Sequence, residues 1–474
     1  MRKVNSITLV IILCGFVASL LMSKYNLDKH DVNIVDGTQV YHKMIKTDPY
    51  RYLSHGYEIK NQIIKGEKFF SLGRENYTKY LPPRIAALYY YIFDINFSSN
   101  PETKQVNTGN HFFYLFFQCL IYYFSVVCLY LSIFKTVDRN ILLFSVLFLC
   151  VEPTIFQYHS TFWSESIFFS IQLIIMALIF SEKKNIFNFF LIGFFIGLLS
   201  LQKQIAIFYI VPITLYFLFF DRRKILRNLS FIIIGFYIIQ IFIGLSNYYR
   251  SGKFYIMTAD TKVEMHRNMV VKVMSKKLNI SHKEFKELEG EIVLDWIKLN
   301  NIKIDYNSDS LKKEKGFMSY RRSVIDEKDR FMVDQFIRKR TFHYITEFPV
   351  EFFKHAFNGA IHAPLLNPFH IYSEHNFRSS ENYYLSKKHD ELILPRVVYS
   401  FFIYLFVFFG FIYFLKKKEY RFLFYLIISS LYFFATIFWH GNTRYFLPSY
   451  IYLSFFFGAG INYMYSFLKK NNYF

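Results

Sequence analysis

The sequence contains few cysteines, tryptophans, prolines and charged residues. Among its 474 residues there are four cysteines, three tryptophans and eleven prolines, and only 19% of the residues are charged. Cys14, Cys119, Cys128 and Cys150 all fall inside apolar runs, and no spacing resembles a metal site or a disulfide framework. The sequence therefore predicts buried free thiols, and neither a disulfide scaffold nor a cysteine-based metal centre. No internal repeat or low-complexity tract is present either.

Apolar and aromatic side chains are present in excess. The chain is 53% hydrophobic and contains 60 Phe and 39 Tyr. A soluble protein of this length could not bury so much apolar surface, so the composition favours a membrane protein. The net charge of +21 also fits a nucleic-acid-binding protein. The Lys and Arg residues gather between apolar runs, however, which favours cytoplasmic loops near anionic lipid headgroups, and no nucleic-acid partner is predicted.

The apolar runs predict about ten transmembrane helices. The first, Val4–Met22, contains no charged residue and is long enough to span a bilayer. It follows Met1-Arg2-Lys3 as a signal peptide does, but no small-residue cleavage site follows, so we expect an uncleaved helix. The other predicted spans are 111–134, 141–156, 165–180, 186–201, 204–220, 229–247, 397–415, 422–439 and 445–467.

The basic residues predict how these helices are oriented. With the N-terminus in the cytoplasm, each cytoplasmic connection carries at least two basic residues, as the positive-inside rule requires. These connections are Lys135–Arg139, Glu182–Lys184, Asp221–Arg227, Lys416–Arg421 and the tail from Lys469. We therefore expect a multi-pass protein of the bacterial inner (plasma) membrane, with both termini in the cytoplasm.

Two long segments remain for the extracytoplasmic side. The predicted organisation is an N-terminal transmembrane module (1–247) with a first outer loop (23–110), an outer domain (248–396) and C-terminal transmembrane helices (397–474). The first outer loop has the helical spacing of amphipathic helices that lie along the membrane. Glu284–Lys298 and Asp326–Arg340 predict water-facing helices in the second. The predicted fold class is thus an all-α polytopic membrane protein with a mostly helical second outer domain.

Charged side chains collect at the outer ends of the predicted spans. A charge at a helix centre costs roughly 2.5–3.5 kcal/mol, so charges gathered at helix ends suggest a shared polar cavity. The alternative is that each side chain reaches water separately and has no function. Such a cavity suits a lipid-linked phosphate substrate, with cations holding the phosphate and a carboxylate deprotonating an acceptor hydroxyl. The residues concerned are Asp36, Asp48, Lys79, Arg84, Glu165, Lys203, His440 and Arg444.

The order of these motifs along the chain resembles a known family. The motifs are Asp48-x3-Tyr52, Gly56, Gly66-Glu67, Pro82-Pro83, the stretch His159–Glu165, Lys203, and Arg444-Tyr445-Phe446-Leu447-Pro448. Together they resemble GT-C membrane glycosyltransferases, in the branch that holds protein O-mannosyltransferases and bacterial lipid A aminoarabinose transferases. The resemblance runs from Asp48 to Pro448.

The resemblance implies a function and a role for each site residue. Such enzymes transfer a sugar, with inversion, from a polyprenyl-phosphate donor to an acceptor hydroxyl outside the cytoplasm. Asp48 would be the catalytic base, with Asp36 as its rival, and Glu165 a second acidic site residue. The candidates for binding the donor phosphate are Lys79, Arg84, Lys203 and Arg444, and Tyr52 and His440 are further site residues. Family members commonly carry a basic residue directly before Pro-Pro, and here that position is Leu81.

The same interpretation predicts the partners of the protein, and two alternative functions remain. The expected partners are the lipid-linked donor, a glycan, lipid or protein acceptor, and membrane lipids. No cofactor is predicted, no residue pattern indicates a divalent cation, and the outer-loop histidines are spaced too irregularly for metal ligands. One alternative is an O-antigen-type polymerase or ligase, which the Arg321-Arg322 and Arg338–Arg340 clusters favour. The other is a lipid-linked glycan transporter or flippase.

Overall fold

The protein is almost entirely helical. Apart from its helices, the described residues contain a small antiparallel hairpin of β1 (Ile34–Val35) and β2 (Thr38–Gln39). The predicted all-α membrane fold is therefore confirmed. The computed structural model describes residues 5–28, 34–35, 38–39, 48–68, 80–95, 111–182, 185–221, 225–252, 254–256, 260–362, 393–436 and 443–470.

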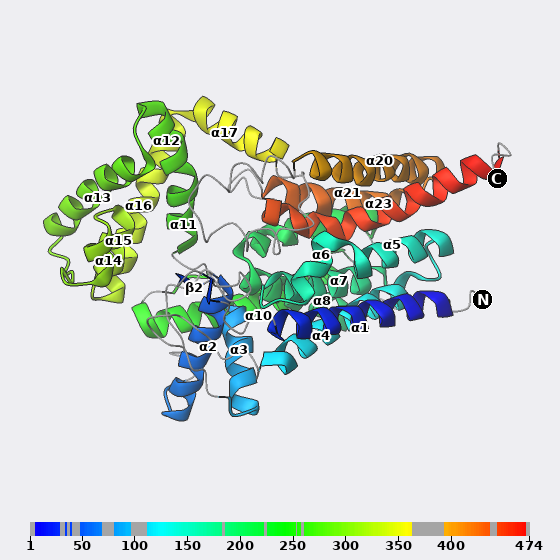
Figure 1. Cartoon of the computed structure of the whole chain (residues 1–474), viewed down its shortest axis with the longest axis horizontal. Helices are drawn as coiled ribbons and strands as arrows, with labels where there is room; N and C mark the ends of the chain where they lie inside the picture. Colours follow the sequence, from blue (N-terminus) through cyan, green and yellow to red (C-terminus); the bar gives the residue numbers. More distant parts are fainter. Residues whose placement is uncertain are drawn as a thin grey trace.

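A bundle of apolar helices forms the larger part of the molecule, and every predicted span overlaps one of them or two consecutive ones (Figure 1). Within the described residues five helices are long and apolar enough to cross a membrane, and α5 with α6 would make a sixth as one bent span. The other apolar helices are 10–17 residues long. The bundle comprises α1 (Ser6–Asp28), α4 (Phe112–Ile133), α5 (Arg139–Val151), α6 (Pro153–His159), α7 (Glu165–Phe180), α8 (Ile186–Gln202), η3 (Gln204–Tyr209), α9 (Ile210–Phe220), α10 (Ile225–Ser251), α20 (Ile393–Lys417), α21 (Tyr420–Ala435) and α23 (Thr443–Lys470).

The outer surface of the bundle is apolar. On α1, for example, Val10, Leu13 and Leu21 are 56%, 60% and 65% exposed. A surface of this kind is stable against lipid tails, whereas in water it would drive aggregation. The chain is therefore an integral membrane protein.

Glycines let neighbouring helices of the bundle touch backbone to backbone. A Cβ added at Gly410 of α20 would lie 1.8 Å from the carbonyl oxygen of Phe456 on α23. A Cβ added at Gly460 of α23 would lie 1.9 Å from the carbonyl oxygen of Phe406 on α20. Small residues allow this close approach, which is a main source of helix association where no hydrophobic effect drives it.

The predicted span 141–156 is not one helix, and this corrects the sequence prediction. The chain breaks between α5 and α6, which are bent by 52°. Glu152 lies at the break as the N-cap of α6, accepting a hydrogen bond from the Ile155 N–H (2.8 Å), and Pro153 follows at the first helical position. An N-cap followed by proline is a helix-start signal. It was hidden here inside an apolar run.

Two helices of the first outer loop, α2 (Asp48–Ile64) and α3 (Leu81–Ile92), pack against each other at one end of the bundle (Figure 1). A Cβ at Gly56 of α2 would lie 2.6 Å from the Cβ of Ala86 and 2.9 Å from the Pro83 carbonyl oxygen. The glycine and the Pro-Pro pair of the predicted motif therefore meet at this helix crossing. Their contact sets how closely α2 packs on α3.

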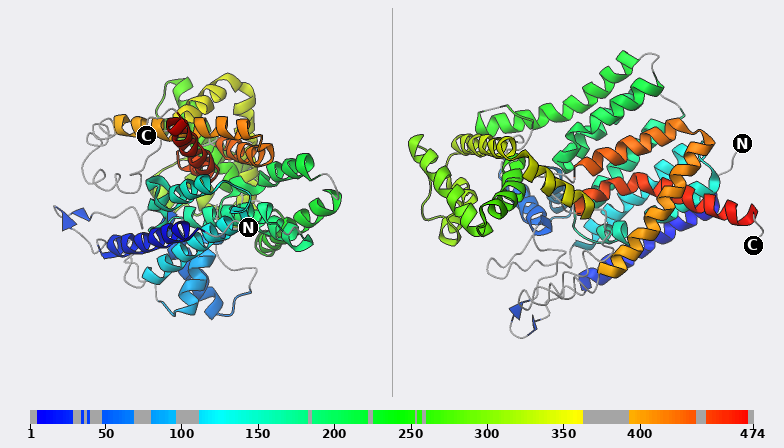
Figure 2. Two further views of the ribbon diagram at one scale, coloured as in Figure 1. Left: turned by 90° about the vertical axis from the view of Figure 1, so that its right-hand side faces the viewer. Right: turned by 90° about the horizontal axis from the view of Figure 1, so that it is seen from above.

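A second helical unit lies at the same end of the bundle, and α1 begins and α23 ends at the opposite end (Figures 1 and 2). We call α11–α17 the outer domain. It has its own hydrophobic core, which includes Val270, Phe285, Val293 and Phe317. The predicted helices Glu284–Lys298 and Asp326–Arg340 fall on α13 and α16. The elements are α11 (Asp260–Met265), η4 (His266–Val270), α12 (Val271–Leu278), α13 (His282–Leu299), α14 (Asp309–Lys313), α15 (Phe317–Ser323), α16 (Glu327–Glu347) and α17 (Pro349–His362).

Candidate active site

The structure joins two of the predicted site residues in a buried ion pair. Lys203 Nζ lies 2.9 Å from Glu165 Oε1, and the two side chains are 4% and 0% exposed. The ammonium group of Lys203 also lies 5.3 Å from the centre of the Phe168 ring. We call Glu165 and Lys203 the bundle ion pair.

Local helix geometry explains how two residues 38 positions apart come together. Glu165 is the first residue of α7, and Lys203 is the C-cap of α8, with extended backbone angles. The two helices pack against each other and run in opposite directions, so the start of α7 lies level with the end of α8. The Gln202 side-chain amide donates to the Ser164 carbonyl oxygen (2.6 Å) and holds the two helix ends together.

Burial makes this ion pair costly to keep. Removing two charges from water carries a penalty of several kcal/mol per ion, which the attraction between them only partly offsets. Ionisable groups inside a membrane protein commonly mark a substrate or ion site. The pair is therefore the strongest candidate for functional chemistry within the described residues.

Tyr80 connects Arg84 of the first outer loop to the end of α8, where Lys203 lies. Its guanidinium carbon is 3.3 Å from the centre of the Tyr80 ring, and Nη1 donates to the Tyr80 carbonyl oxygen (3.1 Å). The Tyr80 N–H in turn donates to the carbonyl oxygen of Leu201 (3.0 Å), two residues before Lys203. The outer loop thus brings a second cation to the end of α8.

The helix that begins at Asp48 packs beside the loop that leads to Glu165. Tyr52 and Leu53 of α2 are buried, and Leu53 shares a hydrophobic cluster with Phe162, three residues before Glu165. Asp48 is the first residue of α2, and the structure describes its backbone only. Asp48 therefore stands on the same short helix as Leu53, which packs in one cluster with Phe162 of the His159–Glu165 motif.

Arg444 is the second residue of α23, which begins at the same end of the bundle, and its backbone alone is described. The side-chain amide of Gln172 on α7 donates to the carbonyl oxygen of Pro448 on α23 (3.1 Å). With a rise of about 1.5 Å per residue, Arg444 lies about 6 Å before Pro448, and Glu165 about 10 Å before Gln172. The starts of α23 and α7 are thus at similar depth. Asp36, Lys79 and His440 lie outside the described residues.

Polar residues that were not predicted as site residues hold the His159–Glu165 motif in place. The Gln118 amide of α4 donates to the carbonyl oxygens of His159 (3.1 Å) and Thr161 (2.7 Å). Asn26 of α1 donates to the carbonyl oxygen and hydroxyl of Ser160, at 3.2 Å each. The sequence signal for both was an amide side chain in or beside an apolar helix. In the described part of the chain, no group of three or more His, Cys, Asp or Glu residues could hold a metal ion.

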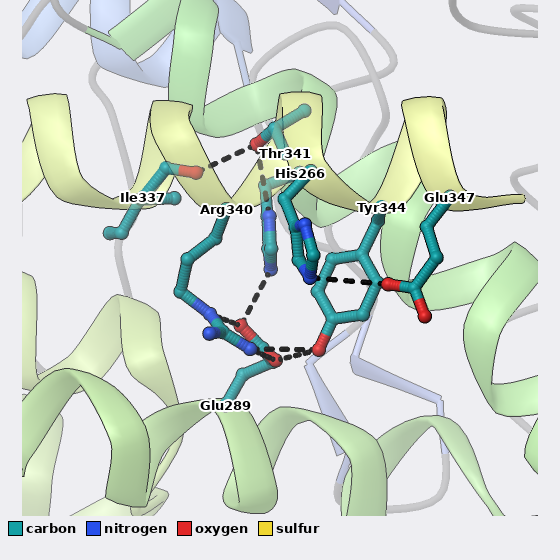
Figure 3. Close-up of polar contacts among 8 residues, drawn as sticks. His266, Glu289, Ile337, Arg340, Thr341, Tyr344 and Glu347 are labelled. Atoms are coloured by element: carbon teal, nitrogen blue, oxygen red, sulfur yellow. Dashed lines mark hydrogen bonds and ion pairs between the residues drawn. The ribbon is translucent and has the colours of Figure 1, made fainter.

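One arginine from each basic cluster of the outer domain is paired with a buried carboxylate of that domain. Arg321 donates two hydrogen bonds to buried Asp334. Nε donates to Oδ1, and Nη2 donates to Oδ2 at 3.1 Å. Arg340 donates to both oxygens of buried Glu289, at 2.8 and 2.6 Å (Figure 3). These arginines therefore stabilise the domain core, which weakens the argument for a polymerase or ligase.

Glu289 lies at the centre of a larger polar cluster (Figure 3). The Tyr344 hydroxyl donates to it (2.6 Å), and His266 Nε2 lies 3.2 Å from its Oε2. Burial raises the pKa of Glu289, but the hydrogen bonds from Arg340 and Tyr344, together with the nearby His266 ring, outweigh burial and lower the pKa to about 2. The carboxylate is therefore fully ionised at neutral pH.

Part of the bundle matches a known protein family. Residues 105–246 match the model of a family described as dolichyl-phosphate-mannose-protein mannosyltransferase. The match confirms the GT-C resemblance. It includes both Glu165 and Lys203, whereas Asp48, Arg84 and Arg444 lie outside the matched residues. No curated protein matches the chain.

Proposed function

We propose that the protein is an inverting glycosyltransferase that moves a sugar from a polyprenyl-phosphate donor to an acceptor hydroxyl on the extracytoplasmic face of the membrane. The observation that carries this proposal is the buried pair of Glu165 and Lys203 at the end of the bundle beside α2 and α3. The pair lies inside the residues that match a mannosyltransferase family. That family's name also motivates a lipid-phosphate sugar as the donor.

The chemistry assigns one step to each group. The carboxylate of Asp48 takes the proton of the acceptor hydroxyl, and the acceptor oxygen forms a bond to the anomeric carbon from the face opposite the phosphate. The bond from that carbon to the phosphate oxygen breaks, and its electron pair leaves with the polyprenyl phosphate. Lys203, with Arg84 and Arg444, holds the negative charge that develops on the leaving group. The configuration at the anomeric carbon is inverted.

Glu165 has a positioning role in this scheme. Its carboxylate keeps Lys203 charged and fixed at the end of α8 before the donor arrives. When the phosphate binds, the ammonium group exchanges part of its contact with the carboxylate for contact with the phosphate. A lysine suits this exchange because its charge is a point on a flexible stem.

Sugar release from a panel of polyprenyl-phosphate sugars tests the proposal, with wild-type and Asp48→Asn protein in detergent. Asn keeps the shape of Asp but cannot accept the proton, so we expect turnover to fall by at least about a hundredfold with donor binding retained. Near wild-type turnover of Asp48→Asn would contradict the assignment of the base, and Asp36→Asn is then the next variant to measure.

No described contact favours the two alternatives. A polymerase or ligase would need the outer-domain arginines at its substrate, and Arg321 and Arg340 are bound to buried carboxylates instead. A transporter would need a site reachable from both sides of the membrane. The polar residues of the candidate active site gather at one end of the bundle.

A further inference from the structure

A wide polar recess lies at the end of the bundle opposite the candidate active site. Its volume is about 1020 Å³, and it is formed where α4 and α7 end, α8 and α10 begin, and α20 turns into α21. This is the end at which α1 begins and α23 ends (Figure 1). The charged and amide residues of its lining are Glu182, Asp221, Arg227, Asn228, Lys418, Glu419 and Arg421.

Charges of both signs line the recess. Glu182 is paired with Lys135 (3.0 Å), and Arg421 donates to the Tyr216 hydroxyl (2.8 Å). The side chains of Arg227 and Lys418 have no ion pair or hydrogen bond with any described residue. The recess thus offers two uncommitted cations, with Asp221 and Glu419 in the same lining.

An uncommitted hydrogen-bond acceptor lies in the same recess. Asn228 is only 5% exposed, and its Oδ1 has no hydrogen-bond partner among the described residues. A buried polar atom without a partner costs roughly 1–3 kcal/mol, so a bound donor would stabilise it. The residue before it, Arg227, carries one of the two uncommitted cations.

Exposed apolar residues lie in the lining of the recess or close to it along the chain. Tyr420, which lines it, is 53% exposed, and Phe219 of α9 and Leu226 of α10 are 56% and 81% exposed. Aromatic and apolar side chains at a helix end are typical of the membrane interface. A headgroup in the recess could therefore keep its acyl chains against the apolar helix surfaces.

We propose that this recess binds the headgroup of an aminophospholipid, a lipid that carries a phosphate and a primary ammonium group. Arg227 and Lys418 bind the phosphate. The ammonium group donates a hydrogen bond to Asn228 Oδ1 and is attracted by Asp221 and Glu419. Both the mixed charge and the partnerless acceptor favour this headgroup over a purely anionic one. The site is independent of the proposed glycosyl transfer.

Lipid retention measured by native mass spectrometry tests the proposal. The full-length protein is exchanged into mixed micelles that contain phosphatidylethanolamine, phosphatidylcholine and phosphatidylglycerol in equal amounts. Phosphatidylcholine has the same phosphate but no N–H donor, so we expect the wild-type protein to retain phosphatidylethanolamine with a roughly tenfold preference over it. No preference, or a preference for phosphatidylglycerol, would overturn the proposal without any mutation.

Two variants separate the two halves of the headgroup. Arg227→Ala with Lys418→Ala removes the phosphate ligands, and we expect retention of phosphatidylethanolamine to fall by about tenfold or more. Asn228→Leu removes the acceptor without changing charge, and we expect it to abolish the preference over phosphatidylcholine. Size-exclusion elution and thermal unfolding identify a variant that is misfolded. In that case the lipid preference of the wild-type protein alone tests the proposal.

A matched control and a competitor complete the test. Lys469→Ala with Lys470→Ala removes the same charge from the exposed end of α23, outside the recess, and should leave retention unchanged. An equal loss in this control would show that net charge alone retains the lipid. Displacement of the lipid by millimolar phosphoethanolamine would instead assign the recess to a soluble phosphate compound, and would overturn the lipid proposal.

Discussion

The outer domain and the membrane bundle both bury ion pairs, but they use different cations. The outer domain uses arginine, and the guanidinium groups of Arg321 and Arg340 each grip both oxygens of one carboxylate. The bundle uses lysine, and Lys203 Nζ meets one oxygen of Glu165. A two-pronged arginine contact fixes geometry, whereas a lysine charge can move to another partner with little rearrangement. The difference favours a structural role for the arginine pairs of the outer domain, and it fits the proposed role of Lys203 in binding the donor phosphate.

The largest effect should come from breaking an arginine pair. Arg321→Met leaves Asp334 buried without its cation, and removing one partner of a buried pair typically costs about 3–5 kcal/mol. We expect rapid proteolysis and hydrogen exchange across α15 and α16. Lys339→Met, on the exposed side of α16, is the control and should leave both unchanged. Full protection in Arg321→Met would remove the structural half of the comparison.

The bundle ion pair should separate stability from activity. Glu165→Gln leaves Lys203 buried without its carboxylate, so we expect lower thermal stability and turnover reduced by about a hundredfold. The double variant Glu165→Gln with Lys203→Met removes both charges, so thermal stability should return towards wild type while turnover stays low. Recovery of turnover in the double variant would show that the pair serves structure alone.

Much of the fold, but not the ion pair, could be predicted from sequence. The apolar runs located the bundle helices, and the charge pattern located the ends at which polar residues gather. The break at Glu152 was missed because one carboxylate and one proline are a weak signal inside an apolar run. The contact of Glu165 with Lys203 could not be predicted, since it depends on which helices become neighbours. The clusters that contain Arg321 and Arg340 were interpreted as support for a polymerase or ligase. The buried carboxylates that pair with these two arginines lie 13 and 51 residues away in the sequence, so the pairing could not be predicted.

Acid should weaken the outer domain in a defined pH range. The pKa of Glu289 is lowered from its usual 4.5 to about 2 in the folded protein. A lowered folded-state pKa gives stability that is complete above the unfolded value and is lost as pH falls towards the folded value. We expect Glu289 to contribute about 3 kcal/mol at neutral pH, lost between about pH 4.5 and 2. Hydrogen exchange of α13 against pH measures this, and Glu289→Gln should flatten the profile in that range.

The smallest effect should come from the crossing of α2 and α3. Gly56→Ala places a Cβ 2.6 Å from the Cβ of Ala86, so the two helices must separate. Overpacking of this kind typically costs about 1–3 kcal/mol, and it would shift the start of α2, where Asp48 lies. We expect turnover to fall by about tenfold, and Ser54→Ala on the same helix to have no effect. Unchanged turnover in Gly56→Ala would show that the crossing does not position the base.

Lys203→Met tests the central claim most directly. Its turnover and donor KM should be measured with polyprenyl-phosphate sugars beside the wild type and Lys203→Arg. If Lys203 binds the leaving phosphate, Lys203→Met should lose at least about a hundredfold in kcat/KM, and Lys203→Arg should keep part of the activity because it keeps the charge. Wild-type kcat/KM in correctly folded Lys203→Met would contradict the claim that the bundle ion pair serves sugar transfer.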